Sequence, residues 1–120
     1  MKKRFVLLMV IGVLTAIASV IPSAWGQSSP RRIEITAKRF SYTPNEITLK
    51  KGQPVVLVLK SVDVAHGLRV ADLDVNLKSS AGGTAEVRFT PDKTGDFIGH
   101  CSVFCGSGHG SMVLKLHVVD

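Results

Sequence analysis

The residues best suited to chemistry are concentrated near the end of the chain. The run CSVFCGSGHGSM, residues 101–112, places two cysteines, a histidine and a methionine in the spacing C-x3-C-x3-H-x2-M. Thiolate, imidazole and thioether groups are soft or borderline donors, which copper ions prefer. A second imidazole is available earlier in the chain. The spacing therefore indicates a copper site whose candidate ligands are His66, Cys101, Cys105, His109 and Met112.

The two cysteines also permit a simpler interpretation, a structural disulfide. Exported chains with two cysteines usually pair them in this way. A disulfide, however, does not require a histidine four residues after Cys105 or a methionine three residues after that histidine. It also does not require the glycines at positions 106, 108 and 110, which allow the backbone to wrap closely around a bound centre. The complete pattern favours metal binding over a disulfide alone.

The number of copper ions depends on Cys101. A mononuclear blue-copper site would use both histidines, Cys105 and Met112, and would leave Cys101 without a role. Two thiolates can instead bridge a pair of copper ions, which the histidines and the methionine complete as terminal ligands. The second thiolate therefore favours two ions, and the mononuclear site stays open as the alternative.

Three other polar residues have a possible connection to this site. Asp63 stands three residues before His66 and either orients its imidazole or is an ordinary turn aspartate. His100 precedes Cys101 but points the other way along a strand, so direct ligation is not expected and a supporting role stays open. His117 alternates onto the polar face of the last strand and is expected to be exposed to solvent.

Composition excludes other classes of function. The net charge is +6, and it falls to +3 when Lys2, Lys3 and Arg4 are left out. The remaining charges are scattered, with no basic stripe, so nucleic-acid binding is not expected. The chain also has no Ser-His-Asp arrangement, paired carboxylates or phosphate-binding glycine loop, and hydrolysis or phosphoryl transfer has no support.

The first 26 residues have the character of an export segment. A basic start is followed by an uncharged apolar run over residues 5–21, and Ala24 and Gly26 fit the small-residue rule for cleavage. We expect a signal peptide over residues 1–26, since the apolar run falls a little short of the ~20 residues that span a bilayer. An uncleaved membrane anchor is the alternative, because no charge appears between Phe5 and Pro30. Membrane contact is expected only if this segment is kept. The folded part is expected in the periplasm or on the outer face of the cytoplasmic membrane.

The elements that must position the candidate ligands are strands. Residues 27–32 are expected to be a short tether and residues 33–120 one domain. Apolar alternation with a period of two starts at Ile33 and never becomes helical. About seven short strands separated by turns predict an all-β sandwich. The expected strands are 33–38, 47–49, 55–59, 68–70, 85–90, 97–98 and 113–119, with a turn over 40–46 and an ambiguous stretch over 71–78.

This topology can bring the candidate ligands together. His66 lies in an expected loop, 62–67, that directly follows the most apolar strand, and the other four lie in the loop before the last strand. In an antiparallel sandwich two such loops can share one end. Rigid strands would then hold the donors at fixed separations, which suits electron transfer.

These residues resemble a known family. The run at 101–112 resembles the binuclear copper (CuA) loop of cytochrome c oxidase subunit II, a cupredoxin, and residues 61–67 resemble that family's first-histidine loop. Phe40-x-Tyr42-x-Pro44 with Gly52 resembles its opening strands. The resemblance covers nearly all of residues 33–120 and implies a Greek-key cupredoxin-like sandwich or barrel.

The resemblance also implies a role for each ligand. Cys101 and Cys105 would bridge both coppers, and each histidine would terminate one of them. Met112 would be a weak axial ligand, and Val103 would supply its backbone carbonyl. The family usually has glutamate at position 103, so the carbonyl is kept here and the carboxylate is lost. Its usual transmembrane hairpin and its acidic face for a basic cytochrome c are not evident either.

We therefore expect an exported electron-transfer module with a mixed-valence pair of copper ions. Its redox partner would be a periplasmic cytochrome c or another copper protein, and it would be either an independent module or a subunit-II-like component of a terminal oxidase. One alternative is a periplasmic copper carrier that loads a CuA site elsewhere, and another is the mononuclear blue-copper carrier. A third is a structural domain with a disulfide.

Overall fold

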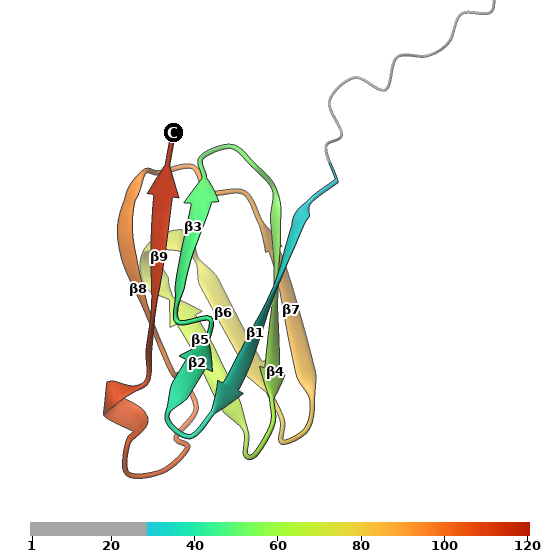
Figure 1. Ribbon diagram of the computed structural model, residues 1–120, viewed down its shortest axis with the longest axis vertical. Coiled ribbons are helices and arrows are strands. Elements are labelled where there is room, and N and C mark those ends of the chain that lie inside the picture. The colour runs from blue at the N-terminus through green and yellow to red at the C-terminus, as the bar shows by residue number, and fades with distance from the viewer. Residues whose placement is uncertain (1–28) are drawn as a thin grey trace, which may run out of the picture.

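Two β-sheets packed face to face form the structure, a computed structural model that describes residues 29–120 (Figure 1). The predicted signal peptide or anchor over residues 1–26 lies outside the described residues. The expected all-β class is confirmed, since the helical segments within residues 29–120 are only two short 3-10 turns. The elements are β1 Arg31–Lys38, β2 Ser41–Thr43, β3 Glu46–Lys50, β4 Val55–Ser61, β5 His66–Val70, η1 Ala71–Leu73, β6 Val75–Ser79, β7 Thr84–Phe89, β8 Gly95–His100, η2 His109–Ser111 and β9 Val113–Val119.

The structure has more strands than the alternation predicted. β2 falls where a turn was expected, because a three-residue strand with one buried side chain next to Pro44 has the composition of a turn. The ambiguous stretch 71–78 divides into η1 and β6. β1 begins at Arg31, two residues before the expected strand and within the predicted tether. Edge strands this short have little periodicity in their sequence, so whether they form depends on pairing with a neighbouring strand.

The sheets have the orders β2-β1-β4-β7 and β3-β9-β8-β5-β6. Most neighbours are antiparallel, but β1 pairs with β4 and β3 pairs with β9 in parallel. Parallel neighbours cannot be joined by a hairpin, so these pairs bring together segments that are distant in the sequence. No helix among residues 29–120 is long and apolar enough to cross a membrane.

The core consists of the inward-facing aliphatic side chains of both sheets. Leu114, Leu116 and Val118 alternate inward along β9, as the sequence pattern predicted, and are at most 3% exposed. In β4 the inward residues are fully buried, and Val58 on the opposite face is also buried, whereas Lys60 is exposed. The prediction that both faces of this strand are buried is therefore confirmed at its middle. This close-packed core fixes the strand ends from which the candidate ligands project.

Candidate metal centre

The two ligand-bearing segments meet at one end of the sandwich. β4 and β8 both end there, and the connections that follow them, residues 62–65 and 101–112, lie side by side at the bottom of Figure 1. The register explains this, because Arg69 of β5 pairs with His100 of β8 in antiparallel fashion. Residues before Arg69 therefore run alongside residues after His100. His66 is the first residue of β5 and not part of the preceding loop, which corrects the sequence interpretation.

The 101–112 loop is closed at its base. Cys101 N–H donates a hydrogen bond to the Met112 carbonyl (3.3 Å), which continues the β8–β9 ladder by one step. Within the loop, His109 begins η2, and Met112 directly follows that turn. The short helical turn brings His109 and Met112 back toward the cysteines.

Cys105 lies at the centre of the donor cluster. Its Sγ is 3.8 Å from Cys101 Sγ, 3.8 Å from His109 Nδ1 and 3.9 Å from Met112 Sδ. The donor atoms of His66, Cys101 and Cys105 all lie within 4.8 Å of one another. The structure thus brings together all five side chains that the sequence singled out, four of them from one loop and one from β5.

The cysteines are reduced thiols in the structure, and both are buried. Their sulfur separation is far longer than a disulfide bond of about 2.05 Å. Burial, with the neighbouring Cys101, raises the pKa of the Cys105 thiol to about 11. A metal ion that binds the thiolates must therefore displace protons.

His66 is oriented by its own loop. The Asp63 carboxylate contacts His66 Nε2 at 2.6 Å and accepts the N–H groups of Arg39 (2.7 Å) and Val64 (2.6 Å). The Arg39 N–H first, and then the His66 and Val64 contacts, hold the pKa of this carboxyl well below its usual range. An ionised carboxylate only accepts hydrogen bonds, so Nε2 carries the imidazole proton. This contact fits the interpretation that Asp63 orients the imidazole of His66, which was one of the two alternatives for this residue.

The remaining nitrogen of His66 has the character of a metal-binding atom. His66 is fully buried, and its Nδ1 has no hydrogen-bond partner among residues 29–120. Buried polar groups are seldom left unpaired, because desolvation without a partner is costly. A ring nitrogen of His66 lies within 4.8 Å of both thiol sulfurs, and the donor set as a whole fits copper.

Val103 contributes backbone to the same cluster. Its carbonyl oxygen accepts a hydrogen bond from the Cys101 thiol at 3.0 Å. The carbonyl that the resemblance singled out therefore lies beside the cluster.

Three residues from the β1–β2 region support the site, although no ligand pattern in the sequence includes them. Arg39 Nε donates to the Cys105 carbonyl (3.1 Å), while its backbone N–H holds Asp63. Tyr42 O–H donates to the Gly67 carbonyl, and burial, with the neighbouring Cys101, raises its pKa. The ring of Phe40 lies against the 101–112 loop. The only signal in the sequence was that Phe40 and Tyr42 belong to the motif that resembles the opening strands of the family.

The glycines of the loop divide into two kinds. A Cβ at Gly108 would lie 2.4 Å from the Phe40 ring, and one at Gly106, where φ is +137°, would lie 2.9 Å from it. These two glycines therefore let the loop pack on Phe40. Gly110 has open space around it, so the expectation that it allows a close backbone approach is not supported.

The two remaining histidines lie outside the cluster. His100 is exposed and is not among the clustered donor residues of the described part of the chain. His117 is half-buried, not fully exposed as expected, because Asp96 of β8 and Glu46 of β3 hydrogen-bond to its two ring nitrogens.

Comparison with known proteins gives this geometry a family context. Residues 28–119 match the family model described as cytochrome c oxidase subunit II, periplasmic domain. The chain is 32% identical over 88 residues to cytochrome c oxidase subunit 2 of Thermus thermophilus, covering 72% of this chain and 65% of that protein. It is 34% identical over 90 residues to nitrous-oxide reductase of Ralstonia nicotianae, covering 72% of this chain and 14% of the reductase.

Among solved structures, the periplasmic domain of subunit II of cytochrome oxidase from Bradyrhizobium japonicum superimposes with a TM-score of 0.70 at 22% identity, covering 78% of this chain and 87% of that one. This similarity confirms the cupredoxin-like fold. The chain spans less than two thirds of the length of the curated relatives described above. The match is therefore to one domain of those proteins.

Proposed function

The chain belongs to the family of the cytochrome c oxidase subunit II periplasmic domain, and on that premise we propose that it is a copper-binding electron-transfer module. The single observation that carries the proposal is the buried cluster of soft donors around Cys105. Its proposed ligands are His66, Cys101, Cys105, His109 and Met112, with the backbone carbonyl of Val103.

Two copper ions are proposed in preference to one. A mononuclear site would need only Cys105, but Cys101 is buried to a similar extent, and its sulfur also lies within 4.8 Å of the donor atom of His66. Both thiols face the same space, which supports bridging by both. Bound there, a copper pair would accept and release one electron at a time.

The surroundings of the cluster support electron transfer more than copper delivery. Cys101, Cys105 and Met112 are at most 6% exposed, so a bound ion would exchange slowly with solvent or with another protein. A carrier needs accessible ligands that can be replaced. Copper that passed readily to a chelator would favour the carrier function instead.

The frame around the ligands is also well suited to a change of oxidation state. Asp63 fixes the imidazole of His66, Arg39 fixes the carbonyl of Cys105, and the β8–β9 ladder fixes the base of the loop. With His66, Cys105 and the base of the loop held in this way, little atomic rearrangement should accompany the gain or loss of an electron. Hydrogen bonds of this kind, which residues outside the donor cluster make to its ligands, are typical of well-organised metal sites.

The location of the domain and its redox partners are also part of the proposal, and they are suggested by the family. We expect the domain to be exported and to face the periplasm, by means of the predicted leader over residues 1–26. A periplasmic cytochrome c or another copper protein is the proposed donor, and a terminal oxidase is a candidate acceptor. A nitrous-oxide reductase with a matching domain shows that similarity of this region is not confined to oxidase subunits.

Electron paramagnetic resonance of the copper-loaded protein, prepared with its cysteines reduced, tests the proposal. We expect hyperfine splitting shared by two equivalent copper nuclei and a stoichiometry of two ions per chain. Cys101→Ser should convert this signal to that of a single copper or abolish it. His100→Asn, a change in the adjacent exposed histidine, should leave it unaltered. Splitting from one nucleus in the unmodified protein, or no bound copper, would contradict the proposal.

A further inference from the structure

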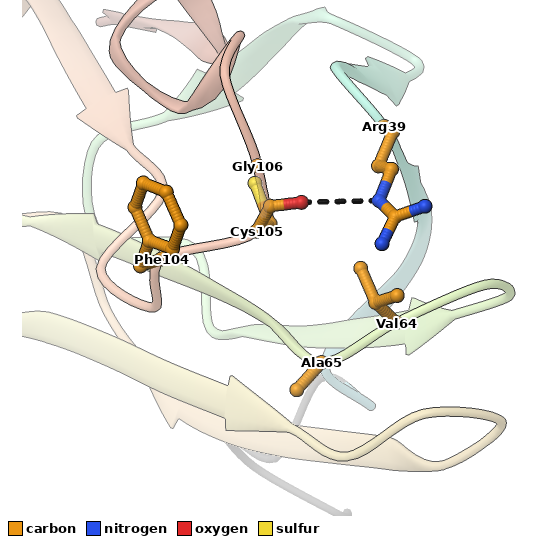
Figure 2. Close-up of a pocket in the computed structure, with 6 residues that line it drawn as sticks. All are labelled: Arg39, Val64, Ala65, Phe104, Cys105 and Gly106. Carbon is orange, nitrogen blue, oxygen red and sulfur yellow. Dashed lines mark hydrogen bonds between the residues drawn. The ribbon is translucent and has the colours of Figure 1, made fainter.

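A hollow opens directly over the backbone of Cys105. Its volume is about 350 Å³, and Figure 2 shows its lining residues gathered around the Cys105 carbonyl and the Arg39 side chain. It is therefore a place where another molecule can approach the sulfur cluster closely. The residues that line it are Arg39, Val64, Ala65, Phe104, Cys105 and Gly106.

Apolar side chains project to solvent around this hollow. Phe104 is 78% exposed, the most of any large hydrophobic residue among residues 29–120, and Val62 is 49% exposed. The Phe104 ring also lies against His109, with 5.5 Å between ring centroids. Exposed apolar side chains grouped at a functional site commonly mark a protein contact. A protein packed on Phe104 would be one ring away from a proposed copper ligand.

The charge at this end of the sandwich is predominantly basic. The exposed lysines 38, 60 and 78 lie at or next to the ends of β1, β4 and β6, where these strands reach the site. Arg39 adds a fourth cation. The only acidic residue in the connections at this end is Asp63, and its carboxylate is occupied by Arg39 N–H, Val64 N–H and His66.

The opposite end carries charged side chains of both signs. Its connections, adjoining strand ends and last described residue contain the acidic residues Asp72, Asp74, Asp92, Asp96 and Asp120 and the basic residues Arg31, Arg32, Lys50, Lys51, Arg69, Arg88 and Lys93. The copper end differs because its basic side chains have a single acidic neighbour in the connections there, Asp63, which is already occupied. A positive field at the copper end would orient an approaching charged protein before contact.

Arg39 also has unused hydrogen-bonding capacity in the hollow. Its Nε is bonded to Cys105, but within the described part of the chain the Nη1 and Nη2 groups have no hydrogen-bond or ion-pair partner. Figure 2 shows the guanidinium beside Val64 on the wall of the hollow. Guanidinium groups with two free nitrogens bind carboxylates particularly well.

From these features we propose that the copper end is the docking surface for an acidic redox protein. A carboxylate of that protein binds the free nitrogens of Arg39, its apolar surface packs on Phe104 and Val62, and the lysines at positions 38, 60 and 78 surround the contact. One electron leaves the reduced partner as the copper centre gains one, or the reverse. This proposal rests on the proposed electron-transfer function, but the docking surface itself does not depend on bound copper.

The surface can be located with a pair of probes that differ in charge. One is native mitochondrial cytochrome c, which is basic, and the other is the same protein made acidic by succinylation of its lysines. Each is titrated into the ¹⁵N-labelled, reduced protein, and amide shifts are recorded. We expect the acidic probe to shift the amides of Arg39, Val64 and Phe104, and the basic probe to leave them unchanged. Shifts centred on Asp72 and Asp92, or produced equally by both probes, would overturn the proposal.

Kinetics with the copper-loaded protein provide the second measurement. The rate constant of electron exchange with the acidic probe should fall about tenfold between about 10 mM and 0.2 M ionic strength, because salt screens the attraction. Lys38→Gln with Lys60→Gln should lower the low-salt rate about threefold, as removal of rim charge changes association rates. Lys50→Gln with Lys51→Gln removes the same charge at the opposite end and should have little effect.

The outcomes separate this proposal from the proposed function. Loss of the two-copper resonance signal would contradict electron transfer but would leave the amide-shift map as a test of docking. A normal copper signal with a rate that rises with salt, or with equal effects of both lysine pairs, would overturn the docking proposal alone. Amide shifts at the copper end that appear with anionic phospholipid vesicles and not with the acidic cytochrome would also overturn it, in favour of a membrane surface.

Discussion

Cys105 shows how much of the candidate site depends on single residues. Its sulfur contacts three of the other proposed ligands, and its carbonyl is held by Arg39. The glycines that follow it are needed for a different reason, since Gly106 and Gly108 let the loop pack on the Phe40 ring. Ligands and packing residues therefore alternate within one short loop, and substitutions of the two kinds should have distinguishable effects.

Replacement of Gly108 by alanine should strain the loop. Its added Cβ would meet the Phe40 ring at 2.4 Å, and a shift of ring or backbone is needed to relieve the contact. We expect the free energy of unfolding in urea to fall by about 1–3 kcal/mol, as for other overpacked sites. Gly110→Ala, with nothing within 4 Å of its Cβ, is the matched control and should be nearly neutral. Equal stabilities of the two variants would show that Phe40 does not constrain the loop.

Replacement of Asp63 by asparagine should weaken copper binding. The carboxylate receives Arg39 N–H, Val64 N–H and the His66 imidazole, and an amide has only one acceptor oxygen for them. Changes in residues that orient a ligand typically cost about 10–100-fold in metal affinity. Competition with a copper chelator measures this loss. Asp72→Asn removes the same charge from an exposed residue at the opposite end, and a similar loss in that variant would indicate a general charge effect.

At the scale of strands and loops, pairing register is what assembles the site. The Arg69–His100 pair aligns β5 with β8, so that His66 reaches the loop after β8. Had the register slipped by one residue, the side chain of His66 would face the outer surface of the sheet. The same five-stranded sheet carries a second polar group on its outer face, where His117 of β9 lies between Asp96 of β8 and Glu46 of β3.

This cross-strand group should make stability depend on pH. The carboxylates of Asp96 and then Glu46, as hydrogen-bond acceptors for the imidazole, raise the pKa of His117 above its ordinary value. A raised folded-state pKa stabilises the protein fully below the ordinary pKa of about 6.5, and the contribution disappears as pH rises through the raised value. The unfolding free energy of the unmodified protein should therefore exceed that of His117→Gln near pH 6, and the difference should shrink at higher pH.

Urea unfolding of both proteins across this range measures the effect, which added salt should reduce because the group is close to solvent. His100→Gln, in a histidine without these carboxylate partners, is the control. A difference that stayed constant with pH, or grew as pH rose, would contradict the assignment of the stabilising form to the protonated imidazole.

At the scale of the whole molecule, the hydrophobic core and the metal site contribute to stability in different ways. Leu57, Leu59, Leu114 and Leu116 are fully buried between the sheets and do not depend on a bound ion. Metal binding adds stability by mass action on top of this core, about 4 kcal/mol when free copper is a thousand times its Kd. This distinguishes the domain from small metal-dependent folds, which are unfolded without their ion.

Copper removal should therefore lower the thermal midpoint without abolishing cooperative unfolding. Circular dichroism during heating, with the copper-loaded protein and after chelation, measures both quantities. Cys105→Ser should show the lower midpoint whether or not copper is added. An apo protein without a cooperative transition would mean that the metal is needed to fold the sandwich, and an unchanged midpoint would mean that the native state does not bind copper.

The sequence alone determined the all-β class and the identity of the donor cluster, and it did so for local reasons. Alternation of apolar side chains marks strands because of their period of two, and the C-x3-C-x3-H-x2-M spacing keeps four donors within one loop. The short strand β2 was missed, because three residues carry too little periodicity.

Only the tertiary structure decided how the rest of the site is built. His66 meets the cysteines through the register of β5 with β8, and Arg39, Phe40 and Tyr42 reach the site because β1 ends and β2 begins beside it. The grouping of Lys38, Arg39, Lys60 and Lys78 at the copper end was also hidden in the sequence, where charges of both signs are interspersed. Contacts between residues far apart in the chain depend on packing and pairing, which no local pattern records.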